Sequence, residues 1–404
     1  MDRIMRQKAE DYLTELCVKI KDRSVGSGGN IEATLFFEKT VAELGWDTEK
    51  TELNAVDWEN GGCELIADGS RFETFVGPYS NGCNVDAILE TAADIEELEK
   101  VNAEGKILLL YGEIAKEQLM PKSFVFYNPP EHQKIISLLE QKGIKAIISA
   151  TGRNAALAGG VYPFPLIEDG DFDIPSVYMT EEEGEKLLKY KGNVITLNSY
   201  SQRIKSRCYN VTARKGKNNS ERIVITAHID AKKGSPGAID NATGVVILML
   251  LAEKLKNYHG KYSIELIPFN GEDYYAVPGQ MEFLEKNKNK FGDILLNINI
   301  DGAGYKIGES AFSFYGVPDE MKQRIMGLIN SGAGILEGAQ WPQGDHSMFV
   351  QQNRPAIAVT SKWFSDNVNC QTITHTPKDN FNIVDCRRLT ELSFTISEIV
   401  KKIL

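Results

Sequence analysis

The sequence predicts an α/β protein with a mostly parallel, mixed sheet sandwiched by helices and interrupted by an inserted β-rich α/β domain. After residue 206, short β-branched strands alternate with helical stretches, the pattern of a parallel sheet covered on both faces. From about residue 61 to 198 the sequence pattern changes to that of short strands with interspersed glycines. A length of 404 residues exceeds one ordinary core, and 42% apolar residues can fill two.

These observations predict two domains, one of them discontinuous. Residues 1–60 and 199–404 are expected to form the larger domain, and residues 61–198 the insert. The chain opens with helical spacing over residues 2–22, followed by a second predicted helix at 31–44. The glycine-rich sequence SVGSGGN between them lacks the Lys-Ser/Thr of a Walker loop and follows a helix, which favours a plain interhelix turn.

The insert contains four predicted strands and two predicted helices. Thr180 followed by Glu183 is a capping box, which marks the start of the second helix. A single histidine, His132, precedes the first helix, and we assign it no catalytic role because no other metal-ligating residues cluster near it. The predicted strands are KILLLYG (106–112), SFVFY (123–127), KAIISA (145–150) and IPSVYM (174–179), with a helix at 134–143.

The second half returns to strand and helix alternation. A strand is expected at 47–57 in the first segment of the same domain, and a packed helix at 244–255. The remaining predicted strands are 208–213, 223–227, 262–269, 294–300, 311–315 and 356–360, and the remaining helices are 278–286, 318–329 and 387–404.

Charge and cysteine content restrict the partners and the compartment. A formal net charge of −11 without a Lys/Arg cluster argues against nucleic acid or an anionic membrane surface and favours small ligands or peptides. The charged N-terminal stretch does not read as a signal peptide, so a cytoplasmic location is expected. Six scattered cysteines without a CxxC pair predict free thiols. Whether the chain forms a homo-oligomer stays open.

Polar side chains follow the predicted strands of the larger domain. In open α/β sheets, ligands bind where strands end and helices begin. His228 and Asp230 leave the strand 223–227 two residues apart, so both side chains point the same way. The other candidates of this kind are Asp240 before the helix at 244–255, Glu272 and Asp273 after the strand 262–269, Asp301 after 294–300, Asp345 and His346 in a later loop, and His375 and Asp379 after 356–360.

Mixed histidine and carboxylate ligands suit zinc, whereas calcium takes oxygen ligands alone. Two zinc ions about 3.5 to 4 Å apart need a bridging carboxylate and further ligands for each ion. Asp240 can bridge. Glu272 remains free of that set, and can act as a general base because adjacent side chains along a chain diverge. The set divides into His228 with Asp301 for one ion and Asp273 with His375 for the other.

The ordered motifs AHID, AIDNATGVV, FNGEDYY, NIDGAG, GDHSMF and THTPKDN resemble the co-catalytic di-zinc aminopeptidase family, whose relatives include glutamate carboxypeptidase and glutaminyl cyclase. The insert resembles the protease-associated domain of several exopeptidases. The resemblance implies a zinc metallopeptidase that removes N-terminal residues from peptides, with two zinc ions per chain. It also implies a cis peptide bond between Asp240 and Asn241. Its residue roles are Glu272 as general base; His228, Asp240, Asp273, Asp301 and His375 as zinc ligands; Asp230 orienting His228; Asp379 supporting His375; and Asp345 and His346 in the substrate pocket.

Two positions depart from the family pattern. Most relatives have Glu-Glu where this chain has Glu272-Asp273, and the shorter carboxylate predicts a weaker second zinc site. Some relatives place a tyrosine before the last histidine as an oxyanion donor, where this chain has Thr374. The donor, the side-chain specificity, and the choice between aminopeptidase, carboxypeptidase and dipeptidase activity stay open.

Three alternative functions are weighed against this hypothesis. The polar residues could be ordinary solvated loop positions. The chain could be a binding or scaffold protein on the same fold, although the presence of Glu272 argues against it. A glutaminyl-cyclase-like transferase would use one zinc through Asp240, Asp273 and His375 and would need neither His228 nor Asp301. The zinc content per chain and the products separate these alternatives.

Overall fold

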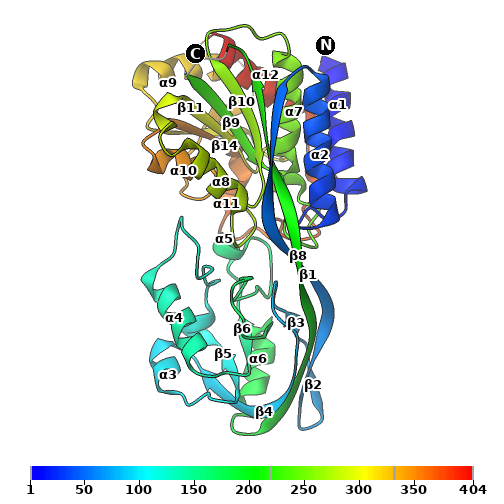
Figure 1. Ribbon diagram of the computed structural model, residues 1–404, viewed down its shortest axis with the longest axis vertical. Coiled ribbons are helices and arrows are strands. Elements are labelled where there is room, and N and C mark those ends of the chain that lie inside the picture. The colour runs from blue at the N-terminus through cyan, green and yellow to red at the C-terminus, as the bar shows by residue number, and fades with distance from the viewer. Residues whose placement is uncertain (1, 218–220, 331–333, 403–404) are drawn as a thin grey trace. The chain divides into compact units, whose positions relative to one another are not determined.

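The computed structural model describes residues 2–217, 221–330 and 334–402 (Figure 1). The chain divides into two compact units. We call Met1–Ala55 with Arg207–Leu404 the main unit, and Val56–Ser206 the inserted unit. Two long strands, β1 (Asp47–Ala67) and β8 (Val194–Lys215), each pass from one unit into the other. The chain therefore leaves the main unit once and returns to it once.

The main unit contains a mixed sheet in the strand order β13-β12-β14-β11-β9-β10-β8. The four central strands β14, β11, β9 and β10 run parallel, while β8 and β12 are antiparallel to their central neighbours. This arrangement confirms the predicted fold class. The strands not yet bounded are β9 (Arg222–His228), β10 (Ser263–Phe269), β11 (Ile294–Ile300), β12 (Ser310–Tyr315), β13 (Ile335–Glu337) and β14 (Ala356–Ser361).

Helices cover both faces of this sheet (Figure 1). On one face α7 (Thr243–Leu255) is buried along almost its whole length and packs against α1 (Asp2–Thr14), α2 (Gly28–Glu43) and α12 (Cys386–Lys402). A helix without a polar side needs this enclosure, because it is hydrophobic all round. The other helices of the main unit are α8 (Pro278–Asn287), α9 (Asp319–Asn330), α10 (His346–Gln351) and α11 (Lys362–Asn367).

The opposite face of the sheet packs aromatic rings from two of these helices. Phe283 of α8 lies 5.3 Å from Phe269 of β10 and 5.4 Å from Phe349 of α10, measured between ring centroids. Phe291 completes the cluster at 6.0 Å from Phe283. These tilted and edge-to-face contacts anchor α8 and α10 beside the carboxyl ends of the central strands.

The inserted unit has its own sheet, in the order β8-β4-β5-β6-β7-β3, with β4, β5, β6 and β7 parallel. Along β5, Ile107 and Leu109 enter one apolar cluster while Leu108 enters another, so each face of the strand has a separate core. The elements are β2 (Ser70–Phe72), β3 (Phe75–Val76), β4 (Cys83–Ala92), β5 (Ile107–Leu110), β6 (Ala146–Thr151), β7 (Ser176–Thr180), α3 (Ile95–Lys100), α4 (Pro130–Gln141), α5 (Ala155–Ala158) and α6 (Glu181–Leu188).

The predicted strand SFVFY is wrong. Residues 123–127 form turns and irregular chain, and Val125 and Tyr127 are exposed. The side-chain amide of Asn128 donates to the carbonyl oxygens of Pro121 and Lys122, which closes the segment on itself. A strand requires a neighbouring strand for its main-chain hydrogen bonds. Here the Asn128 side chain supplies local hydrogen bonds to the main chain instead.

Further boundaries differ from the predictions, and the strand expected at 47–57 continues to Ala67. Helix α2 begins at Gly28 instead of residue 31, because the Ser27 side chain accepts a hydrogen bond from the Asn30 amide at 3.0 Å and caps the helix there. The strand expected at 208–213 is the last part of the 22-residue β8. All six cysteines are free thiols, as predicted. Among the described residues, no helix combines the length and apolar character needed to span a bilayer.

Candidate metal centre

The carboxyl ends of β9, β10 and β11 bring the predicted polar residues together. His228 is the last residue of β9 and pairs in register with Phe269, the last residue of β10. Asp301 directly follows β11, and its main-chain amide still bonds to Val359 of β14 at 2.9 Å. Since parallel strands end at the same sheet edge, the loops that follow them meet above it.

The carboxylate of Asp240 lies between two imidazoles. Its Oδ1 is 3.1 Å from Nε2 of His228, and its Oδ2 is 3.0 Å from Nε2 of His375. Asp240 belongs to the turn Ala238–Ala242 just before α7, and the peptide bond from Asp240 to Asn241 is cis, as the resemblance implied. Each oxygen of one carboxylate thus faces a different histidine, which is the arrangement a bridging ligand needs.

The remaining carboxylates complete two ligand groups that share Asp240. Asp301 Oδ1 lies 3.7 Å from Nε2 of His228, and Asp273 Oδ1 lies 3.2 Å from Nε2 of His375. In each group, one nitrogen or oxygen from every member lies within 4.8 Å of the others. The first group is His228, Asp240 and Asp301, and the second is Asp240, Asp273 and His375.

The chemistry of these donors fits zinc ions. Nε2 of His228 lies beside the carboxylates of Asp240 and Asp301 without a hydrogen bond of regular geometry, and Oδ2 of Asp273 is buried without a hydrogen-bond partner among the described residues. Buried polar atoms are normally hydrogen-bonded, so these two atoms indicate a partner of another kind. Imidazole nitrogen with carboxylate oxygen is a donor set that zinc prefers. His228, Asp240, Asp273, Asp301 and His375 are therefore the residues that could hold such ions.

Burial and charge act in opposite directions on the two imidazoles. Burial by itself would lower the pKa of His228, but Asp230, Asp240 and Asp301 outweigh it and raise that pKa well above its usual value. Burial would also lower the pKa of His375, but the neighbouring carboxylates of Asp273 and Asp240 outweigh burial and raise that pKa well above its usual value. The site therefore attracts positive charge strongly, and a bound cation would displace the imidazole protons.

Glu272 lies beside the two ligand groups without being needed by either. One of its oxygens falls within 4.8 Å of ligand atoms of His228 and Asp273. Desolvation, together with Asp273, Asp301 and Asp345, raises the pKa of Glu272 well above its usual range, although His228 opposes the shift. A carboxylate with a raised pKa next to a metal position is suited to accept and return a proton.

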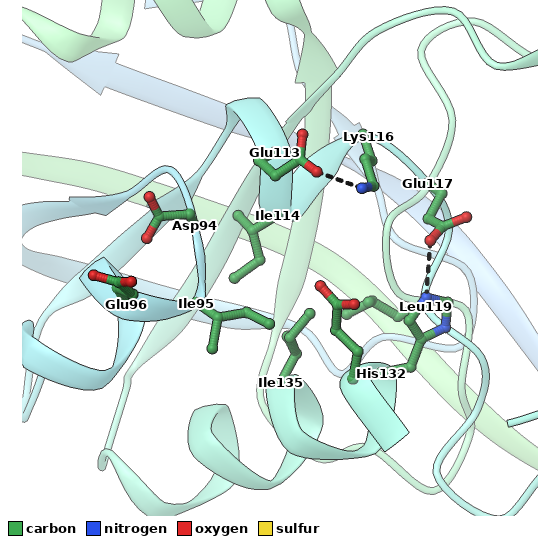
Figure 2. Close-up of a pocket in the computed structure, with 11 residues that line it drawn as sticks. Asp94, Ile95, Glu96, Glu113, Ile114, Lys116, Glu117, Leu119, His132 and Ile135 are labelled. Atoms are coloured by element: carbon green, nitrogen blue, oxygen red, sulfur yellow. Dashed lines mark hydrogen bonds and ion pairs between the residues drawn. The ribbon is translucent and has the colours of Figure 1, made fainter. Parts of the chain in front are cut away.

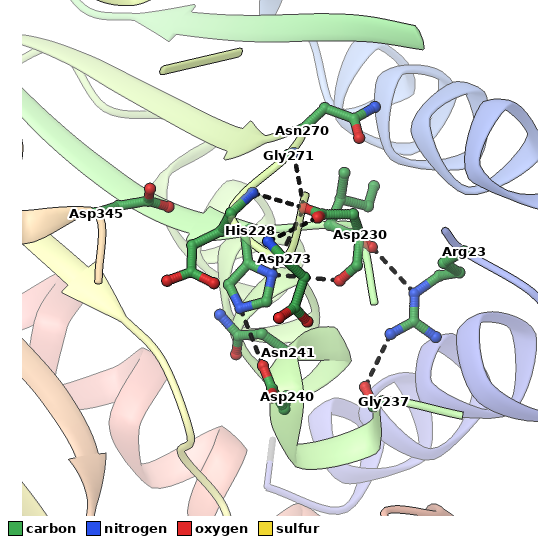
Figure 3. A network of polar contacts seen from close by, with 12 residues as sticks. Arg23, His228, Asp230, Gly237, Asp240, Asn241, Asn270, Gly271, Asp273 and Asp345 are labelled. Atoms are coloured by element: carbon green, nitrogen blue, oxygen red, sulfur yellow. Dashed lines mark hydrogen bonds and ion pairs between the residues drawn. The ribbon is translucent and has the colours of Figure 1, made fainter. Parts of the chain in front are cut away.

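Asp230 supports both strand ends at once (Figure 3). Its Oδ1 accepts hydrogen bonds from the amides of Gly271 at 2.8 Å and Glu272 at 3.2 Å, and its Oδ2 accepts one from Asp273 at 2.9 Å. The main-chain oxygen of Asp230 lies 3.2 Å from Nδ1 of His228, and Oδ1 lies 3.6 Å from the same nitrogen. The predicted contact with His228 is therefore present, and the turn that carries Glu272 and Asp273 rests on the same carboxylate.

Asp379 contacts the main chain next to Asp240, and its support of His375 stays a prediction. Its two oxygens accept hydrogen bonds from the amides of Ile239 at 2.7 Å and Asp240 at 3.0 Å. Burial, together with Asp240, raises the pKa of Asp379 to about 7. Asp379 therefore positions the main chain of Asp240. His375 itself has φ of 63°, in the left-handed region, so its loop holds a conformation that a histidine rarely adopts.

Asp345 and His346 begin α10 and are both buried. Gln280 of α8 donates to Oδ1 of Asp345 at 2.8 Å, while Oδ2 has no hydrogen-bond partner among the described residues. Burial raises the pKa of Asp345 to about 7. His346 packs between Tyr315 and Trp341, with each ring centroid 4.6 Å away, and its Nε2 lies 3.0 Å from the Trp341 carbonyl oxygen. The charge of Asp345 acts on Glu272 and raises its pKa, whereas His346 packs against two aromatic rings.

A separate cavity of about 280 Å³ lies within the inserted unit (Figure 2). His132 lines it, and its Nε2 lies 3.2 Å from Glu117 while its Nδ1 accepts a hydrogen bond from the Met120 amide at 3.1 Å. The histidine is thus paired on both nitrogens, in keeping with the absence of a predicted catalytic role. The rest of the lining combines Lys116, which is paired with Glu113, with acidic and apolar side chains, namely Asp94, Glu96, Glu113 and Glu131, and Ile95, Ile114, Leu119 and Ile135.

Residues 210–400 match the sequence model of peptidase family M28. The matched range contains all five candidate metal ligands, from His228 to His375. Aminopeptidase YwaD of Bacillus subtilis (strain 168) is 22% identical over 273 residues, which cover 65% of this chain and 59% of the relative. Leucine aminopeptidase 2 of Trichophyton equinum is 22% identical over 368 residues, covering 83% of this chain and 68% of the relative. The alignment with YwaD thus spans less than two thirds of that relative's length.

Solved structures share the fold of this chain. An aminopeptidase from Aneurinibacillus sp. strain AM-1 superposes with a TM-score of 0.76 at 18% identity, covering 98% of this chain and 93% of the other. BSAP, a zinc aminopeptidase from Bacillus subtilis, gives a TM-score of 0.74 at 19% identity, with 98% and 94% covered. At this identity, the comparison shows a common architecture that extends over the inserted unit as well.

Proposed function

We propose that this M28 chain is a zinc-dependent aminopeptidase that hydrolyses N-terminal residues from peptides. The observation that carries the proposal is the position of Asp240, whose two oxygens face His228 and His375 at 3.1 and 3.0 Å. Asp301 and Asp273 extend this bridge to two complete ligand groups. The names of the similar proteins, which include aminopeptidases and a zinc aminopeptidase, support the same activity and metal.

Bound zinc would supply Lewis-acid chemistry, lowering the pKa of water and polarising the scissile carbonyl group. The chain's own groups provide the proton transfers. Glu272 accepts the proton of the attacking water and then donates it to the departing amine, which its raised pKa favours. Asp230 holds the turn bearing Glu272, and Asp379 holds the main chain of Asp240, so both reacting positions are fixed before substrate arrives.

The number of metal ions follows from the same geometry. Two ligand groups that share one carboxylate would hold two ions per chain. Asp273 is one methylene shorter than the glutamate expected from the resemblance, so we propose that the ion held by Asp273 and His375 binds more weakly. Zinc titration of the metal-free protein, read by chelator competition, should then give one tight and one weaker equivalent per chain.

The inserted unit resembles a protease-associated domain in sequence, and we propose that it serves this aminopeptidase as such a domain. Its parallel strands β4 to β7 with apolar clusters on both faces are compatible with that resemblance. The cytoplasmic location and the oligomeric state stay predictions.

A substrate panel tests the function. Aminoacyl p-nitroanilides or amides, N-blocked dipeptides and peptides with N-terminal glutamine are each incubated with and without chelator, and zinc is counted per chain. Cleavage of the free-amine substrates alone, abolished by chelator and by Glu272→Ala, supports an aminopeptidase. Cyclisation of N-terminal glutamine with one zinc would instead identify a transferase, and zinc-free protein without turnover would identify a binding protein.

A further inference from the structure

We propose that Asn30 and Asn270 form a positioning pair that sets the turn carrying Glu272 and Asp273. The inference deepens the proposed function, since it concerns the same metal centre. Nδ2 of Asn30 donates to Oδ1 of Asn270 at 2.9 Å, and Nδ2 of Asn270 donates back to Oδ1 of Asn30 at 2.9 Å. Both residues are fully buried. A reciprocal amide pair of this kind fixes both side chains in one relative orientation.

The rest of each amide is also engaged. The second N–H of Asn30 donates to the carbonyl oxygen of Arg23 at 3.0 Å, and the second N–H of Asn270 donates to that of Tyr209 at 3.1 Å. The main chain of Asn270 bonds to the Asn210 side chain at 3.1 Å and to the Gly279 amide at 3.0 Å. Asn270 is therefore held by α2, by β8 and by the start of α8, and it has little freedom to move.

The position of Asn270 in the chain connects this pair to the metal centre. Asn270 is the residue before Gly271, and the amides from Gly271 to Asp273 all point to the carboxylate of Asp230. Gly271 has φ of 117°, and a Cβ there would lie 2.5 Å from Cδ of Pro278. Asn30 therefore holds the start of the turn, and Asp230 holds its main-chain amides. The carboxylates of Glu272 and Asp273 project from this turn in defined directions.

Arg23 anchors the neighbouring loop from the same N-terminal segment (Figure 3). Its buried guanidinium donates to the carbonyl oxygens of Ile229 at 3.0 Å, Pro236 at 2.7 Å and Gly237 at 2.8 Å, and to Leu16 at 2.6 Å. The loop so held contains Asp230 and leads into Asp240. Charge-assisted bonds to main-chain oxygens stabilise a buried cation and fix the chain that supplies them.

Residues 23–30 therefore position two loops of the metal centre. The glycine-rich turn within it lets Arg23 reach the loop after β9 while Asn30, at the start of α2, reaches the turn after β10. Removing the Asn30 amide would leave an oxygen and an N–H of Asn270 buried without partners. The turn would then shift to recover hydrogen bonds, and Glu272 and Asp273 would shift with it.

A double-mutant cycle tests the pair. Asn30→Ala, Asn270→Ala and the double variant are compared with Val41→Ala, a buried change in the apolar core eleven residues further along α2. Five quantities are measured: kcat and KM on an aminoacyl amide, zinc affinity by chelator competition, the visible spectrum of the Co²⁺-loaded protein, and the midpoint of thermal unfolding. The spectrum reports ligand geometry without requiring turnover.

We expect each single Asn variant to lose roughly 10- to 100-fold in kcat or zinc affinity, the range typical of lost outer contacts in metal sites. KM should change far less, the Co²⁺ spectrum should shift, and the double variant should be no worse than the poorer single variant. Val41→Ala should keep wild-type kcat and spectrum even if it unfolds at a lower temperature.

The inference is overturned if Asn30→Ala lowers only the unfolding midpoint, or if the two single effects multiply in the double variant. A different result separates the inference from the proposed function. If the wild-type protein cleaves no free-amine substrate, the aminopeptidase assignment fails, and the Co²⁺ spectrum and zinc affinity of the Asn variants still decide whether the pair positions the metal ligands.

Discussion

Both carboxylate oxygens of Asp379 are occupied by the main chain around Asp240, at 2.7 Å from the Ile239 amide and 3.0 Å from the Asp240 amide. The two segments are far apart in sequence. The loop that supplies His375 therefore also fixes the residue that lies between the two histidines. One loop thereby sets both sides of the second ligand group.

Asp379→Asn should destabilise the protein. An asparagine offers one acceptor oxygen, so its amide would face one of the two main-chain N–H groups and leave that donor unpaired, at a cost of about 1 to 3 kcal/mol. Urea unfolding at pH 7 measures the difference. Asp366→Asn, which removes an exposed i,i+4 ion pair with Lys362, is the control and should cost less than about 0.5 kcal/mol. Equal losses in both variants would contradict the role given to Asp379.

Glu272→Ala should abolish turnover while leaving the metal content unchanged. The side chain is outside both ligand groups that share Asp240, so the metal ions keep their ligands when it is removed. Loss of a general base typically lowers kcat about 10²- to 10⁴-fold. Zinc is counted by elemental analysis and kcat on an aminoacyl amide, with the exposed Glu285→Ala as control. A Glu272→Ala enzyme with the wild-type rate would remove Glu272 from the mechanism.

His375→Ala should lose metal and rate together. Its Nε2 faces both Asp240 and Asp273, and without it the second group retains only carboxylate ligands. We expect the zinc content to fall by about one equivalent per chain, consistent with a site of three protein ligands losing one. Elemental analysis after dialysis against buffer checks this. An unchanged zinc stoichiometry would exclude His375 as a ligand.

Asp345→Asn should shift the pH dependence of kcat. The charge of Asp345 is one of the causes that raise the pKa of Glu272, and a neutral asparagine removes that repulsion. A lower pKa means that Glu272 stays ionised to lower pH, so the acidic limb of the kcat profile should move toward lower pH. The profile is measured between about pH 5 and 9. A limb that moves upward, or does not move, would show that Asp345 does not act on the base.

Glu49 should make stability depend on pH in the acidic range. It contacts Lys286 at 2.8 Å and Arg214 at 2.6 Å, and these two partners lower its pKa from 4.5 to about 2. A lowered carboxyl pKa adds stability above the unfolded value of 4.5, and this stability is lost as the pH falls toward 2.

The variant Glu49→Gln checks that expectation. Since these side chains are about half exposed, the wild-type advantage at pH 7 should be at most about 1 kcal/mol. Urea midpoints at pH 7, 4 and 3 should show the two proteins converging as the pH falls. A difference that stays constant with pH would assign the effect to packing instead of charge.

The four central strands β14, β11, β9 and β10 could be predicted because each is a short, mostly apolar run that is almost wholly buried. The strand predicted at 294–300 is observed as Ile294–Ile300, and its neighbours differ by a residue or so at their ends. SFVFY has the same composition but lacks a partner strand, and Asn128 satisfies the main chain locally. Amino-acid composition gives a segment the tendency to form a strand, but the neighbouring strand that stabilises it is supplied by the tertiary structure.

The ligand candidates could be predicted because they stand at strand ends, where a parallel sheet gathers its loops. The residues that hold those loops could not be predicted in the same way. Asn30 and Asn270 are 240 positions apart, and nothing near either residue indicates the other. Arg23 reads in sequence as one more surface cation, and its burial depends on main-chain oxygens supplied from more than 200 residues away.

The contacts of Glu52 have a consequence for how such a chain can be remodelled. On β1, Glu52 meets Arg207 at 3.2 Å and Tyr209 at 3.1 Å on β8, next to the points where the chain departs from the main unit and comes back. The segment of β1 that leaves the main unit and the segment of β8 that returns to it are thus adjacent. A short hairpin could join these two strands without disturbing the sheet of the main unit. Modular exchange at this edge, by recombination or by design, would alter the appended unit while the histidines and carboxylates beyond it keep their places.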